Sequence, residues 1–195
     1  MLKCEIKSVK TDREDFKMID KYIQNTSDHY KLKVIDLFEI EREGEKKIFN
    51  PLGLKNKKLL FHGSRFSNFP GIIGNGLRIA PPEAPSTGYN FGKGVYLADF
   101  AAKSTPYSCP YLSKNEIILI MCETALGNPR ELTRPDYDAA KLPAGSNSTH
   151  ALGRTRTNPS GNVMFEKDIE VPLGTKETFN GGGMGHNEFI VYNTN

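Results

Sequence analysis

The sequence has few cysteines, no long apolar run and little net charge, and each of these absences excludes a class of protein. Its cysteines are too few and too widely spaced for a disulfide framework or a zinc site: Cys4, Cys109 and Cys122. No uninterrupted apolar run approaches the roughly 18 residues that span a bilayer, and the first residues lack the apolar core of a secretion signal. A formal net charge of +3 gives no reason to expect nucleic-acid binding. We therefore expect an intracellular protein, nuclear or cytoplasmic, with no membrane partner.

The glycine fingerprints of the common nucleotide-binding folds are also absent. Residues 71–76 and 92–94 are rich in glycine, but they lack the G-x-G-x-x-G spacing, and no repeated strand–helix–strand pattern follows them. No stretch matches the phosphate loop that ends in Gly-Lys-Ser or Gly-Lys-Thr. These absences exclude a Rossmann fold and a P-loop fold.

The patterns that are present predict one domain over residues 1–195, of α+β class with mostly antiparallel sheets. Hydrophobic residues make up 37% of the chain and charged residues 25%, which is ordinary for a globular protein. Apolar runs predict strands at 2–9, 31–42, 46–49, 59–62, 94–98, 116–125, 169–172 and 188–192, the second and third forming a hairpin. The run at 116–125 is continuous, which favours a strand covered on both faces.

Helices are expected in three places. The first begins at a capping box formed by Thr11 and Glu14 and continues to about residue 24. Shorter helices are expected at 67–74 and at 99–104, with Asp99 as the cap of the latter. Residues 127–165 are rich in Gly, Pro, Asn and Ser, and we expect a long loop there, of the kind that usually carries function or mobility.

His62 and Ser64 flank Gly63 at the end of the apolar run 59–62. A lone histidine at a strand end is often structural and held by one backbone hydrogen bond. The alternative is a binding site. Gly63 would let a flat amide such as nicotinamide approach the backbone, Ser64 would add a hydroxyl to that amide, and His62 would donate to a sugar hydroxyl.

Three tyrosines surround a glycine-rich turn: Tyr89, Tyr96 and Tyr107. Each alone is more often a core or surface aromatic, but together they suit stacking on a planar, electron-poor ring. Lys103 and Ser104 follow in the short helix after Tyr96, where a lysine is either solvated or directed into the same cleft.

Glu188 begins the last apolar run. An exposed strand-end carboxylate is the simpler interpretation. In the functional one it accepts a hydrogen bond from a ribose hydroxyl, a charge-assisted bond that contributes about 1.5–3 kcal/mol. We predict that the ends of the runs 59–62, 94–98 and 188–192 meet, so that His62, Tyr96 and Glu188 line one cleft that binds a dinucleotide.

Several motifs, in the same order, resemble the catalytic domain of the poly(ADP-ribose) polymerases, in particular the branch that responds to DNA damage. They are 60–65 (LFHGSR), 76–85 (GLRIAPPEAP), 87–89 (TGY), 91–96 (FGKGVY) and 187–192 (NEFIVY). The resemblance runs from about residue 3 to residue 192. It implies an ADP-ribosyltransferase-type fold of two packed, mostly antiparallel sheets with a few short helices.

The resemblance also implies site residues, with NAD⁺ as the substrate and no metal. The family's His-Tyr-Glu triad falls on His62, Tyr96 and Glu188. The remaining positions are implied as donor-binding. The Gly63 backbone and Ser64 would hold the nicotinamide carboxamide, and Tyr107 would stack on its ring. Arg78 would lie near the adenosine part, residues 81–91 with Tyr89 would cover the donor, and Lys103 with Ser104 would lie beside the glutamate. His62 would bind the adenosine-side ribose, and Tyr96 would form the wall opposite Tyr107.

By this resemblance the chain is expected to transfer ADP-ribose to protein acceptors and to elongate poly(ADP-ribose). It is also expected to bind nicotinamide-mimicking inhibitors and to act as a monomer. Because the helical regulatory domain and the DNA-binding modules of relatives are not found in this sequence, activity without DNA is expected. The alternatives are a mono-ADP-ribosyltransferase or an NAD⁺ glycohydrolase, and, in another class, a non-catalytic module that binds NAD⁺ or ADP-ribose. Relatives continue past the last run into a further apolar strand, so a sheet edge is expected to stay open or to be completed differently.

Overall fold

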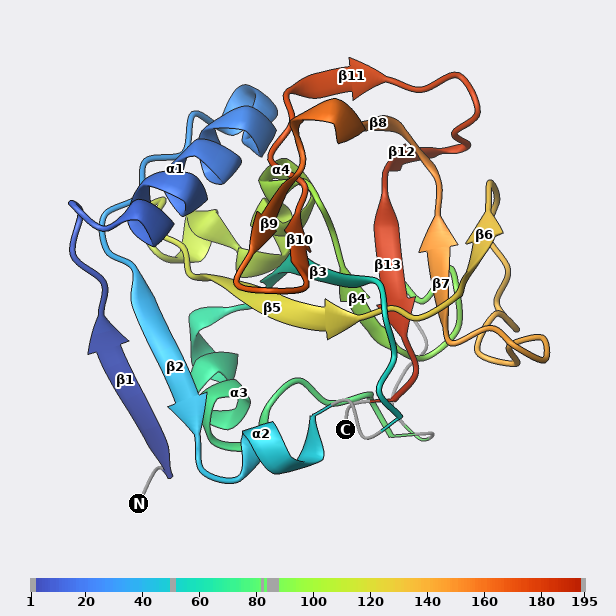
Figure 1. Ribbon diagram of the computed structural model, residues 1–195, viewed down its shortest axis with the longest axis horizontal. Helices are drawn as coiled ribbons and strands as arrows, with labels where there is room; N and C mark the ends of the chain where they lie inside the picture. The colour runs from blue at the N-terminus through green and yellow to red at the C-terminus, as the bar shows by residue number, and fades with distance from the viewer. Residues whose placement is uncertain (1–2, 50–51, 82, 84–87, 194–195) are drawn as a thin grey trace.

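The strand β3 (Lys57–Gly63) is the element around which the rest of the chain is arranged, as the computed structural model shows (Figure 1). The structure describes residues 3–49, 52–81, 83 and 88–193. β3 lies inside a four-stranded sheet of order β5-β3-β10-β9, with β5 (Leu119–Ala125), β9 (Val163–Phe165) and β10 (Ile169–Val171). Successive side chains of a strand point to opposite faces, so the complete burial of both Leu60 and Phe61 means that both faces of β3 are covered.

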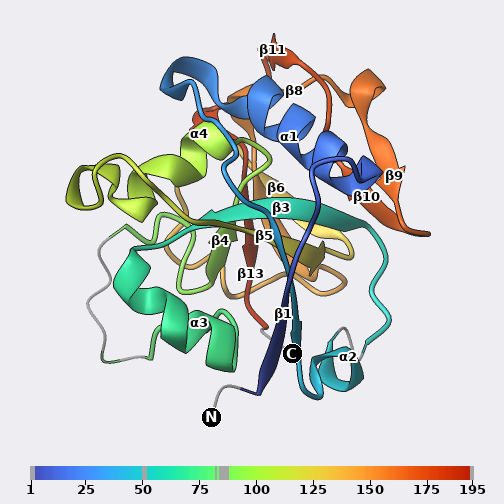
Figure 2. The same cartoon turned by 90° about the vertical axis from the view of Figure 1, so that its left-hand side faces the viewer.

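The two faces of β3 support two separate cores. On one face Phe61 packs with Tyr22 of α1 (Glu14–Thr26), with ring centroids 4.4 Å apart, and with Val171 of β10. On the other face Leu60 packs with Leu97 and Phe189. Figure 2 shows α1 on one side of β3 and α3 (Phe69–Asn75) on the other.

A second sheet joins β3 at its edge. This sheet has the order β4-β13-β7-β6, formed by β4 (Val95–Leu97), β13 (Glu188–Val191), β7 (Ser148–Ala151) and β6 (Pro129–Leu132). The Phe61 amide donates to the Ala98 carbonyl at 2.8 Å, and the Ala98 amide donates back to Phe61 at 3.0 Å. These bonds bring together the strands that carry His62, Tyr96 and Glu188.

Two smaller sheets complete the fold. β1 (Cys4–Ser8) pairs with β2 (Phe38–Arg42), and β8 (Gly153–Thr157) lies between β11 (Lys176–Thr178) and β12 (Met184–His186). The remaining helices, α2 (Glu45–Ile48) and α4 (Ala101–Ser104), are one turn each. Most strand pairs are antiparallel, and β10·β3, β12·β8 and β6·β7 are parallel. The predicted α+β class is confirmed.

Several predicted elements near the N-terminus are wrong in detail. The expected strand over residues 31–42 is strand only from Phe38, and it pairs with β1. It forms no hairpin with residues 46–49, of which 46–48 are helical. The expected capping box is not formed, because α1 begins after Arg13 without a side-chain cap. Isolated apolar residues such as Ile35, which is 68% exposed, give a strand-like pattern without burial to support it.

The expected long loop over residues 127–165 is also wrong. It contains β6, β7, β8 and β9, and two of these strands lie in the sheet that carries Glu188. β6, β7 and β8 are short and largely polar, and β9 is only three residues long, so no sustained apolar period marks them. Their order comes from pairing with distant strands, as with β7 on β13.

β5 has an open outer edge and is mostly only half-buried, whereas its continuous apolar run predicts a strand covered on both faces. Because the Phe61 backbone faces Ala98, the backbone groups of Leu60 and His62 face β5, and on β5 those of Met121 and Glu123 then point outward. No strand pairs with this edge among residues 3–49, 52–81, 83 and 88–193. Beside it runs a groove of about 230 Å³, whose lining includes apolar residues such as Leu77, Leu97 and Val191 and the charged residues Arg42 and Glu45. In the described part of the chain no helix has the length and apolar character needed to cross a membrane.

Candidate active site

His62 is held at the end of β3 by the neighbouring strand. Its Nδ1 atom lies 2.9 Å from the carbonyl oxygen of Tyr96. A carbonyl oxygen can only accept, so Nδ1 carries the proton and Nε2 keeps its lone pair. Burial lowers the pKa of His62, which favours this neutral form at pH 7. His62 can therefore accept a hydrogen bond from a ligand hydroxyl through Nε2, instead of donating one as the sequence analysis expects.

Gly63 is fixed by close packing against α4. A Cβ atom at this position would lie 2.0 Å from the backbone oxygen of Ser104, so only glycine fits. By the alternation of the strand, the Gly63 N–H and C=O point to the same side as those of Phe61, and the described residues give them no backbone partner there. A free donor and a free acceptor side by side suit a carboxamide.

Two serines lie on either side of this position. The Ser104 hydroxyl is buried and donates to the Phe61 carbonyl at 3.2 Å, beside Gly63. Ser64 is partly exposed, and its hydroxyl accepts from Asn68 at 2.9 Å. Ser104 is thus the more firmly held of the two hydroxyls next to Gly63.

Tyr96 shapes the glycine-rich turn before β4. Its hydroxyl donates to the Gly92 carbonyl at 2.8 Å and accepts from the Phe91 amide at 2.9 Å. Burial is the main reason that the pKa of Tyr96 is raised well above its usual range. The Tyr89 ring lies 5.9 Å from the Tyr96 ring, tilted by 52°. The Tyr96 hydroxyl is therefore already engaged by the protein's own backbone.

Glu188 shares a face of the sheet with Tyr96. Ile190 pairs directly opposite Tyr96, and Glu188 lies two residues before Ile190, so all three side chains point to one face. Glu188 is 6% exposed, and one carboxylate oxygen lies 2.9 Å from Nζ of Lys103 on α4. The simpler expectation of an exposed, solvated carboxylate is therefore wrong.

Tyr107 extends the same side of the site. It lies on the turn Thr105–Ser108 directly after α4 and is 58% exposed. The Lys103 ammonium lies 6.0 Å from the centre of its ring. An exposed aromatic ring beside the lysine that pairs with Glu188 can cover one face of a flat ligand.

Arg78 is exposed. It donates to the Asn75 side chain at 3.2 Å, a bond at the protein surface, and within the described residues it makes no hydrogen bond or ion pair with the other candidates. The expected donor-covering loop, residues 81–91, falls partly outside the described residues, since Pro82 and residues 84–87 are not among them. No group of three or more His, Cys, Asp or Glu side chains suited to a metal ion occurs in the described ranges.

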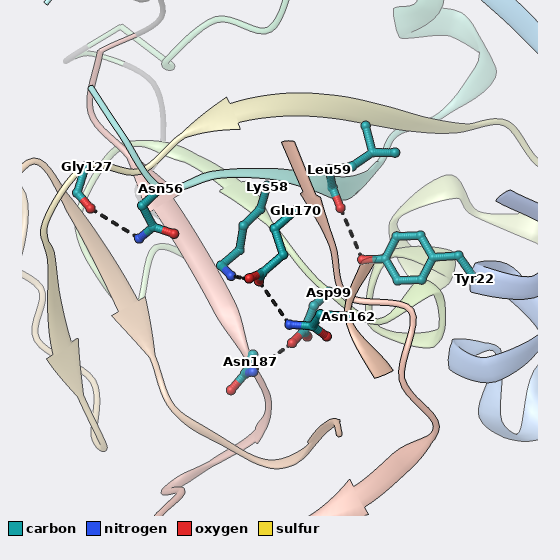
Figure 3. A network of polar contacts seen from close by, with 9 residues as sticks. All are labelled: Tyr22, Asn56, Lys58, Leu59, Asp99, Gly127, Asn162, Glu170 and Asn187. Atoms are coloured by element: carbon teal, nitrogen blue, oxygen red, sulfur yellow. Dashed lines mark hydrogen bonds and ion pairs between the residues drawn. The ribbon is translucent and has the colours of Figure 1, made fainter. Parts of the chain in front are cut away.

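The sequence analysis missed a buried polar pair behind the site. The Asn187 side-chain amide donates to Asp99 at 2.8 Å (Figure 3). Its side-chain oxygen accepts from the Gly153 amide at 2.8 Å. Asp99 does not cap α4 as expected, because the cap position is Phe100 and has no side-chain hydrogen bond. The available signal was the position of two polar residues. Asp99 directly follows the apolar run 94–98, and Asn187 directly precedes the run 188–192.

Comparison with known proteins finds one family. The family model described as "Poly(ADP-ribose) polymerase catalytic domain" matches residues 13–195. The chain is 43% identical to poly [ADP-ribose] polymerase 2 of Arabidopsis thaliana, with 98% of this chain and 31% of that protein aligned. It is 45% identical to poly [ADP-ribose] polymerase 1 of Gallus gallus, over 98% of this chain and 19% of that protein. The chain therefore spans less than a third of the length of these two relatives.

Proposed function

The chain belongs to the poly(ADP-ribose) polymerase catalytic-domain family, and we propose on that basis that it transfers ADP-ribose from NAD⁺ to protein acceptors. The observation that carries the proposal is the buried Glu188 carboxylate, paired with Lys103 on the face of the sheet that also bears Tyr96. A buried carboxylate costs free energy unless it is paired, so its presence at a strand end supports a chemical role.

The donor would be held at its nicotinamide ring and at its adenosine-side ribose. The free backbone groups of Gly63 would bind the carboxamide, with Ser104 and Ser64 beside them, and Tyr107 would cover the ring opposite Tyr96. Nε2 of His62 would accept from a hydroxyl of the adenosine-side ribose. Arg78 and Tyr89 remain candidates for the adenosine part and the covering loop.

The reaction breaks the bond between the ribose C1′ atom and the nicotinamide nitrogen. The bonding electrons leave with nicotinamide, which departs neutral, and the ribose develops oxocarbenium character. Glu188 would accept a hydrogen bond from the ribose 2′-hydroxyl and stabilise this positive charge. The acceptor oxygen then bonds to C1′, and its proton is released. Lys103 would hold the Glu188 carboxylate in place through their 2.9 Å ion pair.

We propose polymer formation as the finer activity, with single ADP-ribose transfer and NAD⁺ hydrolysis as the alternatives. Glu188 supports elongation, because a carboxylate beside the reacting ribose can also orient an incoming ribose hydroxyl. We further propose that residues 1–195 act without DNA. A non-catalytic NAD⁺-binding module would have no need of the buried Lys103–Glu188 pair.

The test is an assay with labelled NAD⁺ that measures nicotinamide release and product size, with and without DNA. We expect labelled protein without DNA, a ladder of product sizes, and loss of the ladder in Glu188→Gln with donor binding retained. Glu116→Gln, an exposed carboxylate outside the strands and helices, is the matched control and should behave as the wild type. A folded wild-type chain that releases no nicotinamide overturns the proposal. A single product size would assign single transfer, and release without labelled protein would assign NAD⁺ hydrolysis.

A further inference from the structure

We propose that Asp99 and Asn187 are positioning residues that fix the direction of the Glu188 carboxylate through the start of β13. The proposal rests on the proposed function for its kinetic consequence, but the geometry behind it is independent of any substrate. Asn187 and the Asp99 side chain bonded to it lie on the face of β13 opposite to Glu188.

The pair closes the gap where two strands of the site part. β4 and β13 pair as far as Leu97 opposite Phe189. Beyond that rung the described residues show no further backbone pairing between β4 and β13, and Ala98 pairs with Phe61 of β3 on the other side. Asp99 lies two residues after Leu97, and Asn187 lies two residues before Phe189. Their side chains are joined by the 2.8 Å hydrogen bond. Along β13, Glu188 lies between Asn187, which bonds to Asp99, and Phe189, which pairs with Leu97.

Asn187 makes a second connection that fixes β13 from the other side. Its side-chain oxygen accepts from the Gly153 amide at 2.8 Å, and Gly153 begins β8. A Cβ atom at Gly153 would lie 2.2 Å from the Asn187 amide nitrogen, so the two backbones touch here. With both ends of its amide engaged and 5% exposure, Asn187 has one available orientation. The Glu188 side chain points to the opposite face of the strand, toward Lys103.

Stability alone does not account for Asp99. Its Oδ1 atom is buried and has no hydrogen-bond partner among the described residues, and burial raises its pKa to about 6. A half-satisfied buried carboxylate is costly, and an apolar residue of similar volume is often as stable. A group that weakens the fold while locking the residue before Glu188 fits a role in aiming that carboxylate.

The test exchanges the two side chains. In Asn187→Asp two carboxylates face each other, whereas in the double variant Asp99→Asn with Asn187→Asp one amide again donates to one carboxylate. The new carboxylate at position 187 can still accept from Gly153, so every bond is restored with the direction of the side-chain bond reversed. Asp99→Asn alone keeps an acceptor for Asn187, and Asp99→Ala removes it. Ser148→Ala is the control. Ser148 lies on β7, beside β13, and the substitution removes the buried 2.8 Å hydrogen bond that its hydroxyl donates to the Leu126 carbonyl.

We expect Asp99→Ala and Asn187→Asp to lower kcat for nicotinamide release roughly tenfold or more, with the KM for NAD⁺ within about twofold of the wild type. Asp99→Asn and the double variant should stay within about threefold of the wild-type kcat. Ser148→Ala should lower the melting temperature without lowering kcat. The proposal is overturned if Asp99→Ala loses no more kcat than Ser148→Ala, if KM rises in step with the loss, or if the exchange restores nothing.

A second measurement keeps this inference separate from the proposed function. The carboxyl ¹³C signal of Glu188 should shift in Asp99→Ala and stay in place in Asp99→Asn and Ser148→Ala, whether or not the chain turns over NAD⁺. A wild type without turnover defeats the proposed function alone. An unmoved Glu188 signal in a folded Asp99→Ala variant defeats the positioning role.

Discussion

The Lys103 ammonium lies 2.9 Å from the Glu188 carboxylate, although 85 residues separate them in the chain. Lys103 comes from α4 and Glu188 from β13, so the ion pair joins the turn after β4 to the strand that pairs with β4. The Glu188 side chain is 8% exposed and that of Lys103 is 26% exposed, so solvent screens the pair only in part. The pair is therefore a structural link as well as a candidate reaction centre.

Lys103→Met is expected to lower stability by about 1–3 kcal/mol, because it leaves a buried carboxylate without its charged partner. Nicotinamide release should fall about tenfold or more, and Lys103→Arg should recover part of it. Urea denaturation and the release assay measure the two effects. The control is Lys141→Met, which breaks an ion pair with Asp138 whose two side chains are 82% and 76% exposed and should cost less than about 0.5 kcal/mol. Equal losses in the two methionine variants would contradict this account.

Tyr107→Ala is expected to weaken binding of a nicotinamide-mimicking inhibitor by about tenfold, the loss of one aromatic contact of about 1 kcal/mol together with its buried area. Tyr111→Ala is the matched control, since Tyr111 is 73% exposed and lies on the turn that follows. Titration calorimetry of both variants decides the point. Equal affinity of Tyr107→Ala and the wild type would remove Tyr107 from the site.

Gly63→Ala is expected to destabilise the protein by about 3 kcal/mol or more, since the new methyl group would lie 2.0 Å from the Ser104 oxygen and α4 would have to move. Gly71→Ala is the control. It lies in α3 with open space around it, and alanine there should add about 0.5–1 kcal/mol of stability. Thermal and urea unfolding of the two variants should differ in sign. A Gly63→Ala protein as stable as the wild type would show that β3 and α4 are less tightly packed than described.

Acid is expected to act on two buried groups in opposite directions. Burial raises the pKa of Asp99 from 3.8 to about 6, so its stabilising effect is fully present below pH 3.8 and is lost as the pH rises through about 6. Burial lowers the pKa of His150 from 6.5 to about 4, so its stabilising effect is present above pH 6.5 and is lost as the pH falls through about 4. Each effect is worth about 3 kcal/mol. His62 and His186, whose pKa values burial also lowers, add to the loss at low pH.

Asp99→Asn removes the first effect and leaves the others. We expect its unfolding free energy to fall between pH 7 and pH 4 by about 3 kcal/mol more than that of the wild type. Urea denaturation at several pH values across this range measures the difference. Parallel curves for the two proteins would show that Asp99 ionises in the folded chain as it does in water.

The parts of the site that could be predicted from sequence are those with continuous apolar strands beneath them. Runs such as 59–62 and 188–192 are largely buried, and a polar residue at the end of such a run is easily noticed. The strands over residues 127–165 were missed because β8, with the sequence GRTRT, has no apolar alternation and is ordered by its neighbours β11 and β12. The Asp99–Asn187 pair was missed for a related reason, since it depends on the register between β4 and β13, which no local pattern encodes.

The pairing of β3 on its two edges has a consequence for how the protein loses activity. On one edge of β3, Lys57 and Lys58 pair with β10 and Phe61 pairs with Ala98 after β4. The other edge pairs with β5 over the whole length of β3. A slip of one residue would exchange Leu60 and Phe61 between two different cores and turn the His62 ring away from Tyr96. Partial misalignment is therefore as damaging as unfolding. In a denaturant titration, enzymatic activity and tertiary structure should therefore be lost at the same denaturant concentration, without a folded intermediate of reduced activity.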